Sequence, residues 1–273
     1  MITASIVTFH TKHDELARLI NCVLNSPIER LYVIDNSSND ELRDFLKDAS
    51  EKITYIHSQN LGYGSGHNIA FQRSLELNAD YHVVLNPDIY WKDNVIAVLK
   101  EFMDKERECG LVMPNIIYPD GKTQYLCKLL PTPWDSIVRR FVAIKSLKRY
   151  HDNKYELHLS GYNSIMEVPV LSGCFMFIRC SILKKVGGFD DRYFMYAEDV
   201  DLCRRIGEIS KTLFYPYVSV VHEYEKGSYK NKKLLKYHIN SMVKYFNKWG
   251  WIWDKKRSHK NRYCIELIKK SLK

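Results

Sequence analysis

The feature that most constrains the fold is a regular alternation of short apolar runs with helical patterns over residues 1–90. Apolar runs that read as strands lie at residues 4–9, 31–34, 53–56 and 81–85. Residues 14–24 carry leucine, isoleucine and valine at helical spacing, and helices are also predicted from about residue 41 and over about residues 66–77. Strand–helix alternation of this kind predicts a mainly parallel, doubly wound α/β sheet.

Polar side chains stand where these four predicted strands end. Thr8, Asp35, Asn60 and Asp88 each lie close to the carboxyl end of one strand. Ligands of doubly wound sheets bind at that edge, so we expect these four residues to share one binding face.

The pattern continues with less regularity after residue 90. Residues 123–168 are basic and aromatic without a clear period, and we expect an excursion or a lid there. The remaining predicted elements are helices over 91–109, 198–206 and 233 to about 253, and strands from Leu111, over 168–178 and over 212–221.

Length and composition exclude several classes of protein. The 273 residues, 45% of them apolar, suit one large α/β domain or a core domain with a small appendage. No apolar run approaches the roughly 18 residues that span a bilayer, and no secretion signal is expected at the N-terminus. The seven cysteines contain no Cys-x-x-Cys pair, which predicts reduced thiols in a cytosolic protein and argues against a structural zinc site.

The positive charge is concentrated in the tail. Residues 226–273 contain 15 Lys and Arg against two acids, whereas the other 225 residues hold 26 basic and 30 acidic side chains. Such asymmetry predicts a segment that faces a polyanion, either nucleic acid or an anionic membrane surface. The run Trp249–Trp253, with lysines on both sides, is typical of a membrane interface; the alternative is an ordinary C-terminal helix whose aromatic face covers the core.

Two acidic motifs are candidates for chemistry. Asp88 ends the Asn-Pro-Asp turn after a strand, where a carboxylate can hold a divalent ion against a diphosphate, although the tripeptide alone is a turn about as often as a site. Glu198 and Asp199 are adjacent, and neighbouring carboxylates in a cleft can separate into a base and an orienting partner. Their alternative role is to offset the dipole at a helix start.

Two further signals are weak by themselves. His222 ends an apolar strand, where a half-buried structural histidine is the commoner finding. The loop from Asn60 to Asn68 resembles a dinucleotide fingerprint but has His67 where the third glycine would fall. It is either a flexible loop before a helix or a set of backbone donors for phosphate or sugar.

Taken together, these motifs resemble family 2 glycosyltransferases, in particular the bacterial rhamnosyltransferase-like enzymes of O-antigen and capsule assembly. The resemblance covers about residues 4–224. It rests on Val7-Thr8-Phe9-His10, Val33-Ile34-Asp35-Asn36-Ser37-Ser38, Asn60-Leu61-Gly62 to Asn68, Leu85-Asn86-Pro87-Asp88, Leu171-Ser172-Gly173, Gly187-Gly188-Phe189-Asp190, Tyr196-Ala197-Glu198-Asp199-Val200-Asp201-Leu202 and His222.

The resemblance implies a GT-A fold and an inverting transfer from a nucleotide-diphosphate-sugar with Mg²⁺ or Mn²⁺ as cofactor. The catalytic domain would be residues 1–225, with a nucleotide-sugar half over about 1–115 and an acceptor half over about 116–225. Residues 226–273 would be a small C-terminal helical appendage.

The resemblance also assigns roles to individual residues. Asp199 matches the catalytic base and Glu198 its partner. Asp88 and His222 match metal or diphosphate ligands, with Asn86 replacing the first acid of the family's Asp-x-Asp motif. The residues expected at the donor are Thr8, His10, Asp35, Asn60, Gly62, Asn68 and Asn86.

The expected partners follow from the same resemblance. They are a nucleotide-sugar donor, commonly deoxythymidine-diphosphate rhamnose, and a saccharide acceptor on polyprenyl diphosphate, with the protein peripheral on the cytosolic face of the plasma membrane. One alternative is a nucleotidyltransferase that makes a nucleotide-sugar, although residues 10–13 lack the glycine expected to hold a triphosphate. A nucleic-acid binder is disfavoured because the acidic clusters would repel a polyanion.

Overall fold

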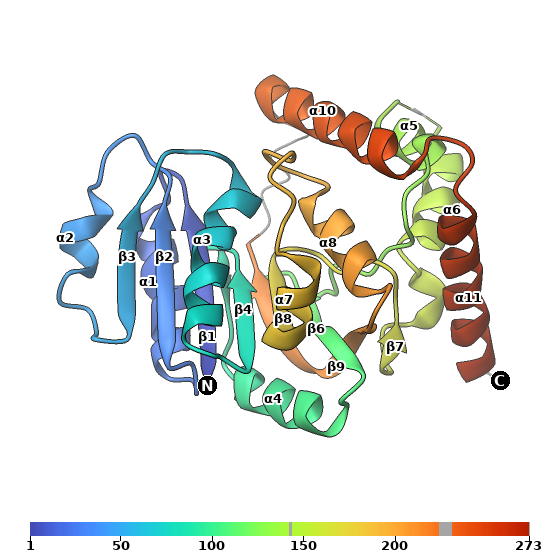
Figure 1. The fold of residues 1–273 in the computed structure, drawn as a ribbon. Coiled ribbons are helices and arrows are strands. Elements are labelled where there is room, and N and C mark those ends of the chain that lie inside the picture. The colour runs from blue at the N-terminus through green and yellow to red at the C-terminus, as the bar shows by residue number, and fades with distance from the viewer. Residues whose placement is uncertain (142–143, 224–230, 273) are drawn as a thin grey trace.

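A computed structural model describes residues 1–141, 144–223 and 231–272, and its strands form a single nine-stranded sheet (Figure 1). The strands are β1 (Ile2–Thr8), β2 (Arg30–Asp35), β3 (Ile53–His57), β4 (Tyr81–Leu85), β5 (Ile89–Tyr90), β6 (Cys109–Ile117), β7 (Met166–Glu167), β8 (Phe175–Arg179) and β9 (Lys211–His222). Their order is β3-β2-β1-β4-β8-β6-β9-β5, and β7 pairs with β9.

The helices connect these strands and continue beyond the last of them. They are α1 (His13–Leu24), α2 (Leu42–Leu46), α3 (Tyr63–Glu76), α4 (Val95–Lys105), α5 (Pro133–Phe141), α6 (Lys145–Tyr155), the 3₁₀ turn η1 (His158–Ser160), α7 (Cys180–Val186), α8 (Glu198–Ile206), α10 (Lys232–Trp249) and α11 (Lys255–Ser271).

The first half of the sheet is the parallel arrangement that the sequence predicts. β1 pairs in parallel with β2 and β4, and β2 pairs in parallel with β3. In this register Thr8 lies opposite Asp35, and Asp35 lies opposite His57. The polar residues at these strand ends therefore meet at the carboxyl edge, as expected.

The second half is mixed. β8 runs antiparallel to both β4 and β6, while β6 and β9 are parallel to each other. Because β8 enters the sheet at the carboxyl edge of β4, the loop before it lies beside the end of β4, and the amide of Asn86 donates to the carbonyl of Cys174 at 2.9 Å. This reversal brings residues 172–174 to the same edge as Asp35 and Asp88.

The C-terminal helices pack against later segments of the chain, α10 above α8 and α11 beside α6 (Figure 1). Tyr245 and Phe246 of α10 join a buried cluster with Tyr193 and Ala197, directly before α8. The aromatic face of α10 thus covers the core, as the alternative interpretation of the tail predicted. The predicted domain boundary at residues 225 and 226 lies outside the described residues.

Two segments differ from the sequence-based expectations. Residues 123–168, expected as an irregular excursion, contain α5, α6 and η1. The helix predicted over 233–253 ends at Trp249, because Gly250 adopts a φ of 99°, and a second helix follows. All seven cysteines are free, as predicted, and none of the described helices is long and apolar enough to cross a bilayer.

Candidate active site

A buried carboxylate, Asp35, lies at the carboxyl end of β2, opposite Thr8 of β1. Its Oδ1 accepts hydrogen bonds from Thr8 Oγ1 at 3.1 Å and from the amide of Ser37 at 3.0 Å. Its Oδ2 accepts one from the hydroxyl of Tyr55 at 2.9 Å. These donors hold the carboxylate at the carboxyl ends of β1, β2 and β3, where the sequence predicts a donor site.

A cavity of about 370 Å³ opens next to Asp35. Its lining includes Phe9, His57 and Asn60. The side chain of Asn60 is held by the backbone, because its Oδ1 accepts a hydrogen bond from the Gly62 amide at 3.2 Å. His10 lies beside this lining: its side chain is exposed and its amide donates to Ser37 Oγ at 2.8 Å. Phe9, and not the neighbouring His10, contributes its ring to the lining of the cavity.

The glycine-rich loop is a structured helix start. Gly62 is the N-cap of α3 with a φ of 109°, and a Cβ at this position would overlap the carbonyl oxygen of Phe194. Asn68 connects α3 to the turn before α8, because its amide group donates to Phe189 O and Asp191 Oδ1 and its Oδ1 accepts from the Phe189 amide. Gly62 and Asn68 thus hold the turn that directly precedes Glu198 and Asp199.

Asp88 and His222 meet at the end of β4 and β9. Asp88 Oδ2 lies 3.3 Å from His222 Nε2, and the Nδ1 of the histidine lies 3.0 Å from Gln124 Oε1. The other carboxylate oxygen of Asp88, Oδ1, is buried without a hydrogen-bond partner. Although the described residues include no group of three or more acidic, histidine or cysteine ligands, a buried oxygen of this kind is suited to a cation that substrate phosphates also bind.

Glu198 and Asp199 open helix α8. Asp199 is half-buried, and its Oδ2 accepts from the Gly173 amide at 3.0 Å while its Oδ1 accepts from the Val200 amide at 2.8 Å. Glu198 is buried, and its Oε2 has no hydrogen-bond partner. Burial first, and the neighbouring Asp199 carboxylate second, raise the pKa of Glu198 well above its ordinary value. The two acids therefore differ in their environments, as expected for residues with different roles.

Tyr63 connects the two acidic motifs. Its buried hydroxyl lies within hydrogen-bond distance of both Asn86 Oδ1, at 2.9 Å, and the carbonyl of Gly173, at 2.8 Å. The same Gly173 donates to Asp199, and Asn86 precedes Asp88 by two residues. Burial, and next the charge of Glu198, raise the pKa of Tyr63 well above its ordinary value, which keeps the hydroxyl a donor. The structure thus places the predicted metal motif and the predicted base at one site.

Asp190 and Asp201, on either side of Glu198 and Asp199 in the sequence, hold helix α10. Asp190 pairs with Arg192 and with Lys248, at 2.6 and 2.7 Å, and these contacts lower its pKa. Asp201 accepts from the Trp249 indole at 2.7 Å and pairs with Lys248 at 2.6 Å. These acids therefore stabilise the fold beside the site, and Lys248 and Trp249 face the protein interior.

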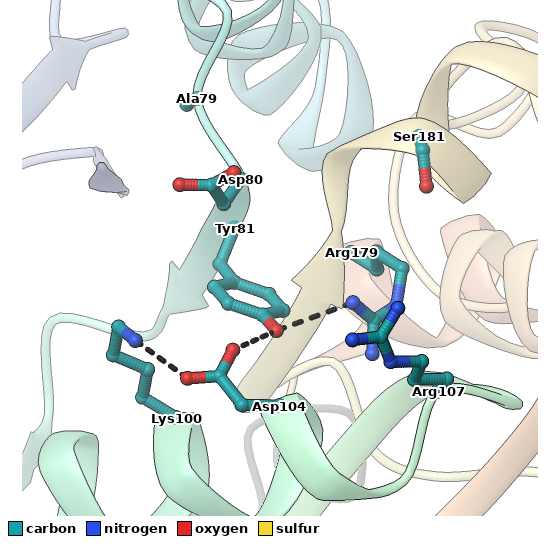
Figure 2. Close-up of a pocket in the computed structure, with 8 residues that line it drawn as sticks. All are labelled: Ala79, Asp80, Tyr81, Lys100, Asp104, Arg107, Arg179 and Ser181. Carbon is teal, nitrogen blue, oxygen red and sulfur yellow. Dashed lines mark hydrogen bonds and ion pairs between the residues drawn. The ribbon is translucent and has the colours of Figure 1, made fainter.

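A second cavity, of about 520 Å³, lies at the opposite, amino edge of the sheet. Figure 2 shows that four of its polar residues form a chain of contacts: Lys100 pairs with Asp104, Asp104 accepts from the Tyr81 hydroxyl, and that hydroxyl accepts from Arg179. Because these charges are already compensated and ligands of such sheets bind at the carboxyl edge, we assign the active site to the carboxyl edge.

Sequence reasoning missed several residues of the site, chiefly Tyr55, His57 and Tyr63. Tyr55 and His57 alternate along β3, next to the strand that carries Asp35. This period-two polar pattern at a carboxyl end is the signal that could have identified them. Nothing local marks Tyr63, since its partners lie 23 and 110 residues away.

The geometry defines a class of protein: an α/β chain that gathers a cavity, the buried carboxylate Asp35 and two further acidic motifs at one edge of its sheet. The family model described as "Glycosyl transferase family 2" matches residues 5–187, more than half of the chain. The chain therefore belongs to glycosyl transferase family 2, and the resemblance inferred from its motifs is confirmed.

Individual relatives agree with this assignment. Rhamnosyltransferase WbbL of Escherichia coli (strain K12) is 26% identical over 253 residues, which cover 88% of this chain and 90% of that protein. The N-acetylglucosaminyl-diphospho-decaprenol L-rhamnosyltransferase of Mycobacterium tuberculosis is 30% identical over 175 residues, 60% of this chain and 56% of that one.

The fold is also found among solved structures. GalNAc-T7, solved with UDP, GalNAc and Mn²⁺, superposes with a TM-score of 0.64 at 15% identity. The match covers 94% of this chain and 48% of that one, so the chain spans about half of GalNAc-T7. The expected GT-A fold is thereby confirmed.

Proposed function

We propose that this protein is an inverting, metal-dependent glycosyltransferase that moves rhamnose or another hexose from a nucleotide diphosphate to a saccharide acceptor in bacterial surface polysaccharide synthesis. The observation that carries the proposal is the connection through Tyr63 of the Asn86–Asp88 turn to the Gly173–Asp199 pair. It joins a candidate site for a departing diphosphate to a candidate base.

The nucleotide half would bind the donor through Asp35. The carboxylate already accepts three hydrogen bonds and lies buried behind the cavity that residues 36–38 and 57–60 help to line. An acceptor oriented in this way suits the N–H group of a nucleotide base, because charge-assisted hydrogen bonds are short and strong. Asn60 lines the same cavity, and Thr8 and His10 would act from beside it through Asp35 and Ser37. Gly62 and Asn68 would contribute to donor binding only indirectly, by holding α3 against the turn before α8.

Asp199 would act as the general base. It takes the proton of the acceptor hydroxyl as the oxygen forms its bond to the anomeric carbon, and the bond from that carbon to the diphosphate oxygen breaks on the opposite face. Glu198, whose pKa is raised by burial and by the neighbouring Asp199 carboxylate, would orient Asp199 or the acceptor through its carboxyl group. Direct displacement requires no covalent partner on the protein.

Asp88 and His222 would hold Mg²⁺ or Mn²⁺, and the unpartnered Oδ1 of Asp88 supports this assignment. A divalent ion supplies positive charge that stabilises the departing diphosphate. The two protein ligands leave the remaining coordination positions to diphosphate oxygens and water, as is common for such ions.

The acceptor would be carried on a polyprenyl diphosphate, as the name of the mycobacterial relative indicates for that protein. A lipid-linked acceptor and a basic C-terminal segment both favour a peripheral location on the cytosolic face of the plasma membrane.

The test combines a binding panel with two variants. Nucleoside diphosphates and nucleotide-sugars are screened by thermal shift with and without Mn²⁺, where saturating ligand should add a few kcal/mol to the unfolding free energy. Asp199→Asn should lose at least about 10²-fold in turnover and keep donor binding. Asp35→Asn should weaken donor binding by roughly tenfold or more.

Two controls sharpen the result. Asp44→Asn, at an exposed acid on α2, should leave both binding and turnover unchanged. Full activity of Asp199→Asn would remove the assigned base, and release of pyrophosphate would replace the proposal with a nucleotidyltransferase.

A further inference from the structure

The connection between α10 and α11 exposes three consecutive large apolar side chains. Trp251, Ile252 and Trp253 are 44%, 77% and 92% exposed. The run Trp249–Trp253, predicted to lie at a membrane interface, therefore has two parts. Trp249, with Lys248, binds Asp201 inside the protein, and only the residues after Gly250 face outward.

This loop is held in place by a buried cation. The guanidinium of Arg257, 4% exposed, donates to the carbonyls of Gly250, Trp251 and Ile252 at 3.1 to 3.3 Å. Because these loop carbonyls point toward Arg257, the exposure of the Trp251, Ile252 and Trp253 side chains is part of the folded structure.

Helix α5 lies next to this loop. Arg257 also donates to the carbonyl of Pro131 at 3.3 Å, and the side chain of Asn261 bonds both backbone groups of Leu130. The start of α5 is therefore fixed against the start of α11, at the upper right of Figure 1. Trp134 and Ile137 of α5 are 61% and 46% exposed.

The apolar side chains are accompanied by cations. Lys255 is exposed, and the side chains of Lys256 and Arg262 are 69% and 71% exposed, although each pairs with an acid, Glu208 and Glu266 respectively. The nearest acid in sequence, Asp254, is buried against Arg204. Tryptophan with lysine and arginine is the composition that binds the headgroup region of anionic bilayers.

We propose that Trp134, Ile137 and Trp251–Trp253, with Lys255 and Lys256, form a docking face that binds an anionic lipid bilayer. Only the purpose of this docking face rests on the proposed function: it would bring the active site to a lipid-linked acceptor. A second copy of the chain is a poorer occupant, since two such basic faces would repel each other.

The docking face is also connected to the catalytic helix. Trp249, two residues before the exposed loop, donates to Asp201 of α8, and Asp254, directly after the loop, pairs with Arg204 of α8. The docked loop would therefore fix how α8, with Glu198 and Asp199 at its start, is oriented toward the membrane.

The experiment uses the full chain with vesicles of phosphatidylcholine, alone or mixed equally with phosphatidylglycerol. Binding is measured by co-sedimentation and by quenching of tryptophan fluorescence with brominated acyl chains. We expect binding to the anionic vesicles only, weakening as salt is raised, with quenching that reports on exposed tryptophans.

Matched variants locate the contact. Ile252→Asp combined with Trp253→Asp should weaken vesicle binding by at least about tenfold without lowering the melting temperature, since both side chains are exposed. Tyr217→Asp, at a residue of β9 that is 64% exposed beside Tyr215, should bind vesicles like the parent.

Three outcomes would overturn the docking face. These are absent binding to anionic vesicles, equal loss in the Tyr217→Asp control, or a dimer in light scattering that the double variant dissolves. Nucleoside-diphosphate binding by the same samples separates the two proposals, because retained donor binding without vesicle binding removes the docking face alone.

Discussion

The buried ion pair between Arg204 and Asp254 joins the C-terminal helices to α8, and its removal should destabilise the whole chain. Arg204 donates two hydrogen bonds to the Asp254 carboxylate, at 2.7 and 2.9 Å, and one to the Tyr245 hydroxyl at 3.2 Å. Its guanidinium also lies 4.0 Å from the ring centre of Trp249. Both members of the pair are almost fully buried, with side-chain exposures of 2% and 4%.

The magnitude follows from what Arg204→Met would leave behind. Asp254 would keep the Arg257 amide as a donor and the Arg257 guanidinium at 3.9 Å, but it would lose its two-pronged contact with Arg204. Breaking a buried pair from one side costs about 3–5 kcal/mol, so we expect a loss of about 4 kcal/mol in the free energy of unfolding. For a chain of this size that corresponds to a fall of about 10 °C in melting temperature.

The measurement is urea unfolding followed by circular dichroism, arranged as a double-mutant cycle. Arg204→Met with Asp254→Asn should be more stable than the sum of the single losses predicts, by about 2 kcal/mol. Arg204→Lys should not restore stability, because an ammonium group cannot form the two-pronged contact and the ring stacking together.

A surface pair provides the control. Lys256→Met removes the exposed contact with Glu208 and should cost less than about 1 kcal/mol. Strict additivity in the Arg204–Asp254 cycle, or an Arg204→Lys protein as stable as the parent, would refute the reasoning.

Two further predictions concern the site. Because the folded protein raises the pKa of Glu198 above the unperturbed 4.5, the folded state keeps a proton that the unfolded chain releases. The free energy of unfolding should therefore fall as pH rises from about 4.5 through the folded pKa. Glu198→Gln should flatten this dependence of stability on pH between pH 5 and 8. If thermal melts of the variant and the parent depend on pH in the same way, the raised pKa of Glu198 is contradicted. Gly62→Ala should lower the free energy of unfolding by more than about 2 kcal/mol and abolish turnover, because its Cβ would overlap the Phe194 carbonyl. The control is Gly121→Ala, at a φ of 83° with open space around it, which should lose only the backbone cost of about 1 kcal/mol. Equal losses in urea titrations would show that the contact with Phe194 is unimportant.

Much of the fold could be predicted because its signals are local. The apolar runs and helical spacing of residues 1–90 predict the parallel half of the sheet, and the helix predicted over 198–206 is α8 as observed. The alignment of Thr8 with Asp35 follows from parallel pairing, which brings all carboxyl ends to one edge.

Other features could not be predicted because they depend on distant partners. Helices α5 and α6 escaped prediction because they expose several of their large apolar residues, so no clear period remains in the sequence. The antiparallel entry of β8 depends on its pairing with β4, about 90 residues earlier, and it is what brings Gly173 to Asp199.

The sequence by itself determined the parallel half-sheet, the family and the acids that can carry the chemistry, because hydrophobic period and motif order are properties of neighbouring residues. Only the tertiary structure decided which acids share a site and which merely hold a helix. Asp190, Asp199 and Asp201 lie close together in sequence, and only the motif resemblance singles out Asp199. The structure adds that Lys248 pairs with Asp190 and Asp201 and that Trp249 donates to Asp201, while Asp199 accepts from the Gly173 amide. A carboxylate's role is set by the charges and donors around it, and here those come from segments up to 58 residues away.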